Sequence, residues 1–484
     1  MQDWQGKKVV VVGAARQGLA LARYLSRHGA QVVLNDRRPA SELQAAQQEM
    51  RDLPVEWACG GHPLSLLNAA DLLCISGGVS LDMPLVVDAK RLGLPLSNDS
   101  QIFLEAAPCR VVGITGSAGK TTTTTLVGRI AWQAFPAGQL SAGRNLTNEG
   151  EHQPGVWVGG NIGNPLVDVL DDIRPDDLAV VELSSFQLEL MTRSPQVAAI
   201  LNLTPNHLDR HGSMQAYAAA KAHILQHQSD QDVAVLGRDD PGAWSFRQMV
   251  RGRLVTFGLS QPPVDQEGAF LREGYLKMHS PADGQPHDRL LMPQSAIQLR
   301  GEHNLRNVLA ACAIAVAAGL PVEAIQAAVQ DFRGVPHRLQ FVRKWHGADW
   351  YNDSIATAPE RSIAAIRSFV EPLVLLAGGR DKDLPWDDFA ELVTRRVDHL
   401  VIFGEAGDKI LQVVEGHRRS SGKGWTRPLT CTRCENLREA VRVASALVQP
   451  GDVVLLSPGG TSFDEFRDFE ERGECFVRWV NELP

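Results

Sequence analysis

The stretch Val111-Val112-Gly113-Ile114-Thr115-Gly116-Ser117-Ala118-Gly119-Lys120-Thr121-Thr122 decides the fold of the chain. It begins as an apolar, β-branched run typical of a buried strand and breaks into a glycine loop with a lysine and hydroxyls. Gly116 and Gly119 allow backbone N–H groups to turn towards an anion, and a helix from Thr121 onward would favour negative charge at its N-terminus. The pattern predicts a strand, a phosphate-binding loop and a helix, against the alternative of a plain strand-turn-helix corner.

The residues of this loop indicate ATP phosphates as the ligand. Lys120 would neutralise the β- and γ-phosphates, and the hydroxyl of Thr121 would ligate Mg²⁺. The usual P-loop spacing requires glycine at position 114, where this chain has Ile114, so the general pattern fails narrowly. The residues predicted to bind ATP here are Gly116, Ser117, Ala118, Gly119, Lys120, Thr121 and Thr122.

Length and composition predict a multidomain cytoplasmic protein. A chain of 484 residues exceeds the usual size of one core, and three domains are expected. The formal net charge of −8 argues against nucleic acid or an anionic membrane as the main partner. The seven cysteines form no disulfide framework, which suits a reducing cytoplasm, and the lone Cys431-x-x-Cys434 pair is interpreted as incidental. The sequence has no signal-peptide core and no apolar run near the roughly 20 residues of a membrane helix, so no membrane insertion is expected.

The N-terminal segment predicts a Rossmann-like domain. An apolar strand at Val9–Val12 leads into a glycine turn and an amphipathic stretch, and a second strand ends beside Asp36, where such folds meet a ribose or base. Ala15 replaces the middle glycine of the dinucleotide-binding pattern, which argues against ordinary NAD binding. A strand at Asp71–Ile75 runs into a further glycine turn, Ser76–Val79. The alternative is a plain α/β domain with tight turns.

The central segment supplies a candidate metal ligand. Glu182 lies in the apolar strand predicted at Leu178–Leu183 and is followed by hydroxyls, so it is a plausible Mg²⁺ ligand that completes the P-loop site. Residues from Ala137 onward are polar, small and aperiodic, which predicts a mobile surface loop.

The C-terminal segment again alternates strands with helices. Strands are predicted at Val374–Ala377, Leu400–Phe403 and Val453–Leu456, and each leads into glycine or a polar turn. This arrangement predicts a doubly wound sheet with ligands at its C-terminal edge. The resulting α/β chain has predicted domains at 1–108, 109–333 and 334–484.

Several motifs occur in the order found in one enzyme family. They are Thr115-Gly116-Ser117-Ala118-Gly119-Lys120-Thr121-Thr122, Gly159-Gly160-Asn161-Ile162-Gly163, Glu182-Leu183-Ser184-Ser185-Phe186-Gln187-Leu188, Asn206-His207-Leu208-Asp209-Arg210-His211 and Ala219-Ala220-Lys221. Over essentially its whole length the chain resembles the Mur ligases, whose short glycine loop is shared with the folylpolyglutamate synthetases. The Rossmann-like opening and the ending at residues 456–473 resemble the family member that adds glutamate.

The resemblance implies a reaction and its cofactors. The expected activity is ATP-dependent ligation of D-glutamate to UDP-N-acetylmuramoyl-L-alanine through an acyl phosphate, with release of ADP and phosphate, in cytoplasmic peptidoglycan precursor synthesis. The implied cofactors are ATP, Mg²⁺ as two ions, and a carbamylated Lys221. The expected partners are these small-molecule substrates, without nucleic acid or membrane insertion, and a monomer is expected.

The resemblance also implies roles for individual residues. The catalytic set is Lys120, His207 and Lys221, and the metal set is Thr121, Glu182, His207 and Lys221. Beyond the loop, ATP would be held by Asn304, Arg338 and Asp353. The UDP-sugar would be held by Ala15, Arg16, Asp36, Arg37, Ser76, Gly78 and Asn161. Glutamate would be held by Thr357, Lys382, Ser462 and Phe469.

The chain departs from the family pattern in the third domain. The family commonly has Asp-Ser-Lys-Ala-Thr where this chain has Asp353-Ser354-Ile355-Ala356-Thr357, so a positive charge near the phosphates is missing, and Gly459-Gly460 and Phe463 also differ from the commoner residues. One alternative is the same chemistry with L-glutamate or another amine. The other is a catalytically inactive nucleotide-binding scaffold. The presence of all four residues expected to act in catalysis or metal binding argues against it: Lys120, Glu182, His207 and Lys221.

Overall fold

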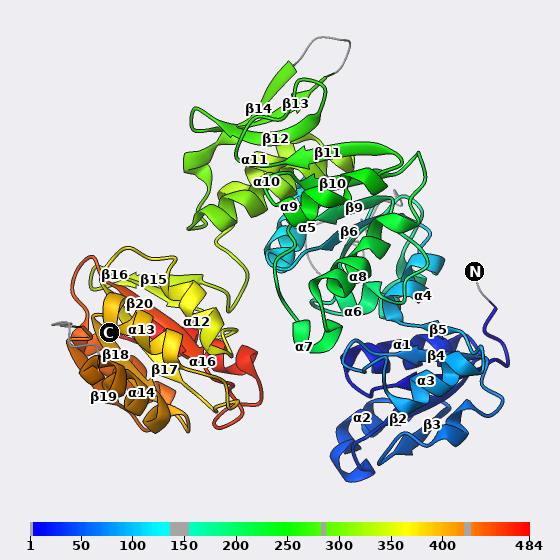
Figure 1. The fold of residues 1–484 in the computed structure, drawn as a ribbon, viewed down its shortest axis with the longest axis horizontal. Coiled ribbons are helices and arrows are strands. Elements are labelled where there is room, and N and C mark those ends of the chain that lie inside the picture. The colour runs from blue at the N-terminus through cyan, green and yellow to red at the C-terminus, as the bar shows by residue number, and fades with distance from the viewer. Residues whose placement is uncertain (1–2, 136–153, 282–286, 421–426) are drawn as a thin grey trace, which may run out of the picture. The chain divides into compact units, whose positions relative to one another are not determined.

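The computed structural model describes residues 3–135, 154–281, 287–420 and 427–484. The surface loop predicted from Ala137 onward lies outside these residues. The chain forms two compact units, one of Met1–Gln298 with Glu302–Phe332 and one of Leu299–Gly301 with Arg333–Pro484 (Figure 1). The first unit contains two sheets and the second contains one.

The N-terminal sheet has five parallel strands in the order β3-β2-β1-β4-β5. In β1, Val9 and Val11 join the cluster that includes Leu21 and Leu25 of α1, whereas Val10 and Val12 join the cluster that includes Leu85 and Val86 of α3. Because both faces of β1 are covered, the strand is apolar throughout rather than alternating. The elements are β1 Lys8–Val12, α1 Arg16–Arg27, β2 Gln31–Asp36, α2 Gln44–Glu49, β3 Val55–Cys59, β4 Leu72–Ile75, α3 Pro84–Arg91, β5 Leu96–Ser97 and α4 Asp99–Ala106.

The central sheet has nine strands in the order β14-β13-β12-β11-β10-β9-β6-β8-β7. The strands from β7 across to β12 are parallel, and β12, β13 and β14 are antiparallel, an extension that the sequence analysis did not anticipate. The strands are β6 Arg110–Thr115, β7 Val156–Gly160, β8 Leu178–Glu182, β9 Val197–Ile200, β10 Val233–Gly237, β11 Arg253–Phe257, β12 Glu267–Arg272, β13 Tyr275–Ser280 and β14 His287–Pro293. The helices are α5 Lys120–Ala134, α6 Ser185–Leu188, α7 Leu208–His211, α8 Met214–Gln226, α9 Pro241–Ser245, α10 Glu302–Ala317 and α11 Val322–Gln330.

The N-terminal and central domains of the first unit are joined by buried amide hydrogen bonds. Asn98 Nδ2 donates to the Gln187 carbonyl at 2.8 Å, and Gln187 Nε2 donates to Ser100 Oγ at 2.8 Å. Arg23 of α1 pairs with Asp168 in the 3₁₀ helix Leu166–Asp172 at 2.5 Å. These contacts set the glycine turns of the N-terminal sheet against the central domain.

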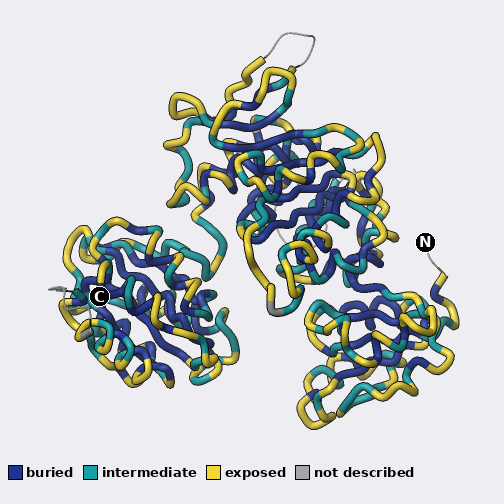
Figure 2. The backbone as a smooth tube through the Cα atoms, in the orientation of Figure 1, coloured by how far each residue is buried: buried dark blue, intermediate teal, exposed yellow. Residues whose placement is uncertain are grey.

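The sheet of the second unit has the order β15-β16-β20-β17-β18-β19, with only the β15–β16 pair antiparallel among its described strands. Alternate residues of β17 enter two different core clusters, so both faces are covered, and Figure 2 shows the buried strand segments. The three predicted strands are present within β17, β18 and β20, and the three-domain α/β prediction is confirmed, while the exact domain boundaries stay predictions. The elements are β15 Gln340–Trp345, β16 Ala348–Asn352, α12 Pro359–Ile366, β17 Leu373–Gly378, α13 Asp387–Arg396, β18 His399–Phe403, α14 Gly407–Ser420, β19 Thr430–Arg433, α15 Leu437–Leu447, β20 Val453–Gly459 and α16 Phe469–Asn481.

Candidate active site

The glycine loop predicted to hold phosphates connects β6 to α5. Gly119 precedes the helix with φ +82°, a conformation that side chains rarely adopt. A methyl group at this position would lie 2.2 Å from Asn307 Oδ1 on α10. Glycine is therefore required here for both its backbone conformation and the space it leaves.

Residues that follow β9 hold the loop in place. The Ser117 amide donates to the Asn202 carbonyl at 3.1 Å, and the Ala118 amide donates to Asn202 Oδ1 at 2.8 Å. The Ser117 hydroxyl donates to the Thr204 carbonyl at 2.9 Å. Asn202 and Thr204 were not among the predicted site residues, because neither carries a motif and their contact spans more than 80 positions of sequence.

Two lysine amines meet at one backbone carbonyl. Lys120 Nζ and Lys221 Nζ each donate to the Gly116 carbonyl at 3.0 Å, and Lys221 Nζ also donates to Thr115 Oγ1 at 3.1 Å. The Lys221 side chain comes from α8 and is 1% exposed. Its burial and the nearby charge of Lys120 place the pKa of Lys221 well below its ordinary value, and Glu182 opposes them. The predicted loop lysine and the predicted carbamate lysine are thus brought together.

Glu182 ends β8 beside these lysines and is 2% exposed. Its Oε1 accepts a hydrogen bond from Asn161 Nδ2 at 2.9 Å, while its Oε2 is buried and has no hydrogen-bond partner among the described residues. Carboxylate oxygens are ligands that Mg²⁺ prefers, and a buried carboxylate oxygen without a partner is costly unless a ligand satisfies it. The residues present therefore fit a divalent cation at this position.

The predicted motif around His207 connects this region to the N-terminal domain. His207 lies before α7 with φ +53°, and its ring contacts the edge of Phe186 at a centroid distance of 5.2 Å. Arg210 stacks over Phe186 at 4.3 Å and donates to the carbonyls of Gly77 at 3.1 Å and of Val79. The glycine turn after β4, which contains Ser76 and Gly78, therefore lies against α7.

Asn161 joins the predicted sugar-binding residues to the predicted metal ligand Glu182. Arg16 Nη2, on the first turn of α1, donates to the Asn161 carbonyl at 3.5 Å, while the Asn161 side chain holds Glu182. Ala15 precedes α1 and is exposed, as is Arg16. Within the first unit, the predicted UDP-sugar and metal sets are thus contiguous.

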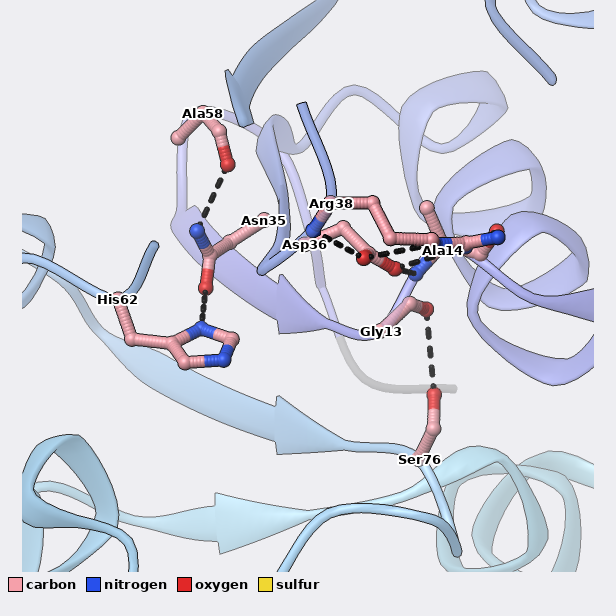
Figure 3. A network of polar contacts seen from close by, with 8 residues as sticks. All are labelled: Gly13, Ala14, Asn35, Asp36, Arg38, Ala58, His62 and Ser76. Atoms are coloured by element: carbon pink, nitrogen blue, oxygen red, sulfur yellow. Dashed lines mark hydrogen bonds and ion pairs between the residues drawn. The ribbon is translucent and has the colours of Figure 1, made fainter. Parts of the chain in front are cut away.

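Figure 3 shows a polar network at the C-terminal edge of β1 and β2. Asp36 accepts hydrogen bonds from the Ala14 amide at 2.8 Å and from Arg38 Nε and Nη2 at 3.0 Å each. Arg37, the predicted residue, is exposed, whereas the adjacent Arg38 makes the ion pair with Asp36. Ser76 donates to the Gly13 carbonyl at 3.3 Å, which ties the two glycine turns together.

Asp36→Asn is expected to destabilise this edge by about 1 to 2 kcal/mol at pH 7. Burial raises the pKa of Asp36, but hydrogen bonds from Arg38 and Ala14 outweigh it and lower the pKa from 3.8 to about 2. A lowered pKa means that the stabilisation is complete above pH 3.8 and disappears as the pH falls towards 2. Water screens the charge of Arg38, whose side chain is 40% exposed, so the expected loss of stability is smaller than the full pKa shift of Asp36 would give.

Urea unfolding of the wild type and Asp36→Asn at pH 7 and at pH 3 measures this effect. The gap between their unfolding midpoints should shrink at the lower pH. A gap of equal size at both values would contradict a role for the ionised carboxylate.

The second unit holds the remaining predicted ATP residues, Arg338 and Asp353, whereas Asn304 lies in α10 of the first. Asp353 follows β16 and accepts hydrogen bonds from Ser457 Oγ at 2.9 Å and from the Leu339 amide at 3.1 Å. Burial raises the pKa of Asp353 to about 7, although these hydrogen bonds and the charge of Arg338 act in the opposite direction. The assignment of Asn304, Arg338 and Asp353 to one ATP site stays a prediction.

A buried arginine organises the predicted glutamate-binding region. Arg472 is fully buried and donates to Ser354 Oγ at 3.0 Å, the Ser354 carbonyl at 2.8 Å and the Gly460 carbonyl at 3.1 Å. The Ser354 hydroxyl in turn donates to the carbonyl of Phe469 at 2.8 Å. One guanidinium thus ties together the loops after β16 and β20 and the start of α16, which carry Thr357, Ser462 and Phe469.

The predicted glutamate ligands differ in exposure. Ser462 is 2% exposed and Thr357 is half-buried, whereas Lys382 is exposed.

Among residues 3–135, 154–281, 287–420 and 427–484, no three His, Cys, Asp or Glu side chains form a metal-binding group. Within the same ranges, none of the helices has the length and apolar character that a membrane span needs. The predicted metal set contains only two side chains of these types, Glu182 and His207.

Comparison with known proteins gives matches over each of the three domains. Models of the Mur ligase MurD-like N-terminal domain, the Mur ligase middle domain and the Mur ligase glutamate ligase domain match residues 7–97, 114–315 and 337–460. A UDP-N-acetylmuramoylalanine--D-glutamate ligase of Symbiobacterium thermophilum is 38% identical over 99% of this chain and 98% of its own. One of the same name from Acidobacterium capsulatum is 39% identical over 98% and 96%.

Solved structures show a similar fold. The UDP-N-acetylmuramate-alanine ligase of Thermotoga maritima aligns over 98% of this chain and 99% of its own with a TM-score of 0.55 at 19% identity. A MurF structure from Acinetobacter baumannii aligns over 99% and 92% with a TM-score of 0.54 at 19% identity. At these identities the likeness concerns the fold.

Proposed function

The chain belongs to the Mur ligase family, and we propose that it joins D-glutamate to UDP-N-acetylmuramoyl-L-alanine with conversion of ATP to ADP and phosphate. The observation that carries the proposal is the meeting of Lys120 and Lys221 at the Gly116 carbonyl, near the buried carboxylate of Glu182. Full-length relatives with this printed activity support the choice of substrates. A cytoplasmic location and a monomeric state stay predictions.

The proposed reaction begins with activation of a carboxylate. The terminal phosphoryl group of ATP moves to the carboxylate of UDP-N-acetylmuramoyl-L-alanine, which gives an acyl phosphate and ADP. The glutamate amine attacks the carbonyl carbon, a proton leaves the nitrogen, and the tetrahedral intermediate collapses to an amide and phosphate. Phosphoryl transfer of this kind depends mainly on positioning and on charge neutralisation.

The residues of the first unit are chemically suited to these tasks. Lys120 and the loop amides would hold the phosphates, and Thr121 and Glu182 would bind Mg²⁺. When bound, Mg²⁺ would neutralise developing phosphate charge, and we propose that His207 and a carbamylated Lys221 serve a second ion. Ala15, Arg16, Asp36, Arg37, Ser76, Gly78 and Asn161 would hold the UDP-sugar at the edge where α/β sheets bind ligands.

Ligand-binding positions in the second unit complete the proposal. Arg338 and Asp353 would contact ATP, and Thr357, Lys382, Ser462 and Phe469 would hold glutamate. Catalysis would then require domain closure, as in other enzymes that assemble a site from separate domains.

Phosphate release measured with ATP, Mg²⁺, UDP-N-acetylmuramoyl-L-alanine and each amino acid in turn tests the function. We expect release and amide product with D-glutamate, because full-length relatives carry this amino acid in their printed names and because Ile355 lies on the phosphate side of its motif rather than at Thr357. Omission of either substrate should abolish release. Product with L-glutamate and none with D-glutamate would overturn the chirality and leave the ligase assignment standing, whereas ATP binding without turnover of any amino acid would favour the inactive scaffold.

A further inference from the structure

The loop after β16 lacks a side-chain cation where the family commonly has one. Ile355 is half-buried, and at this position the chain contributes only backbone hydrogen-bonding groups. A dicarboxylate amino acid brings two negative charges into a site for which the predicted residues supply one cation, Lys382. The hydroxyls of Thr357 and Ser462 can donate to the second carboxylate but cannot neutralise its charge, so a second cation would bind it more strongly.

Arg361 brings a guanidinium to the backbone of this loop. It lies on the first turn of α12, and its Nη1 donates to the Ile355 carbonyl at 3.2 Å. The same carbonyl accepts the Thr357 amide at 2.9 Å. Because both donors share one oxygen atom, the guanidinium lies beside Thr357, a predicted glutamate-binding residue.

The guanidinium is available to a ligand. Arg361 is exposed, and its other side-chain N–H groups have no protein partner among the described residues. The charge of Arg361 acts on Lys382: burial is the main reason that the pKa of this lysine is lowered, and the charge of Arg361 adds to the effect. The charge of Arg361 also acts on the buried carboxyl of Asp353, whose pKa it lowers against the effect of burial. An anion bound near Arg361 and Lys382 would relieve the repulsion between the two cations.

We infer that Arg361 binds one carboxylate of the incoming amino acid while Lys382 binds the other. The inference deepens the proposed function and rests on it. A guanidinium suits this task because two of its N–H groups can donate in parallel to one carboxylate. Arg361 thus supplies, from the neighbouring helix, a second cation beside Thr357.

Steady-state kinetics of Arg361→Gln tests the inference. We expect KM for D-glutamate to rise about 10- to 100-fold, the usual effect of removing a hydrogen-bonded charge, with KM for ATP and for the UDP-sugar unchanged within twofold. Arg361→Lys keeps the charge but loses the paired N–H donors, so it should recover only part of the loss. Arg367→Gln is the matched control, because Arg367 is an exposed arginine that follows the same helix, and it should leave all three constants unchanged.

Inhibitors separate carboxylate binding from a structural effect. In the wild type, glutarate should compete with glutamate more tightly than its monoamide glutaramate, and Arg361→Gln should reduce this preference by about the factor seen in KM. A rise in KM for ATP instead of glutamate, an unchanged preference for glutarate, or an equal effect of Arg367→Gln would overturn the inference. Wild-type activity with D-glutamate tests the proposed function separately, so the two failures are distinguishable.

Discussion

Lys120→Ala is expected to leave the protein folded and to lower kcat by about a hundredfold or more. The amine lies in the glycine loop, where it donates to the Gly116 carbonyl at 3.0 Å and to the Ser117 carbonyl at 3.5 Å. Removal of one charge that stabilises a phosphoryl transfer costs about 3 kcal/mol or more of transition-state stabilisation. The loop itself should survive, because Asn202 and Thr204 hold Ser117 and Ala118 independently of the lysine.

Phosphate release and thermal unfolding of the same preparations measure this prediction. Lys90→Ala is the matched control, since Lys90 is an exposed residue in the last turn of α3 and the substitution removes the same charge. The control should keep wild-type turnover, and both variants should unfold near the wild-type temperature. Near-native turnover by Lys120→Ala would show that the phosphate-loop assignment is wrong.

Local sequence predicted the loop well because its determinants are local. The apolar run of β6, the glycine turn and the start of the helix are consecutive in the sequence, and the strand and helix occupy Arg110–Thr115 and Lys120–Ala134. The position of Glu182 at the end of a strand also followed from an apolar run that ends in a carboxylate. Short-range patterns therefore identified the elements and the polar residues at their ends.

The supporting contacts could not be predicted, because they join residues with no shared pattern. Asn307 lies against Gly119 from a helix almost 190 residues away, and an alanine-rich helix gives no signal of that approach. Arg472 resembles any charged residue of an amphipathic helix, yet it is fully buried with three backbone or hydroxyl acceptors. Such pairings arise only when the strands are ordered in the sheet, which side-chain periodicity does not specify.

Lys221→Ala is expected to lower turnover by about a hundredfold or more and to regain part of it with formate or acetate. The proposed carbamate forms when the neutral amine attacks CO₂, which makes one N–C bond, releases one proton and turns a potential cation into an anion. Lys221 is 1% exposed and lies close to Lys120, and both features lower the pKa of its amine and favour the neutral form that this reaction needs. A small carboxylate could occupy the space vacated in Lys221→Ala and restore the anion.

Lys221→Met separates the missing anion from the missing volume. Methionine fills most of the space of the lysine without any charge, so this variant should be folded, inactive and insensitive to added carboxylates. Wild-type turnover should fall in CO₂-depleted buffer and return with bicarbonate, a response that neither variant should show. If Lys221→Ala kept wild-type turnover, Lys221 would have no place in the metal set. If formate and acetate rescued Lys221→Met as well as Lys221→Ala, they would act elsewhere, because only the alanine variant leaves room beside Thr115 and Gly116.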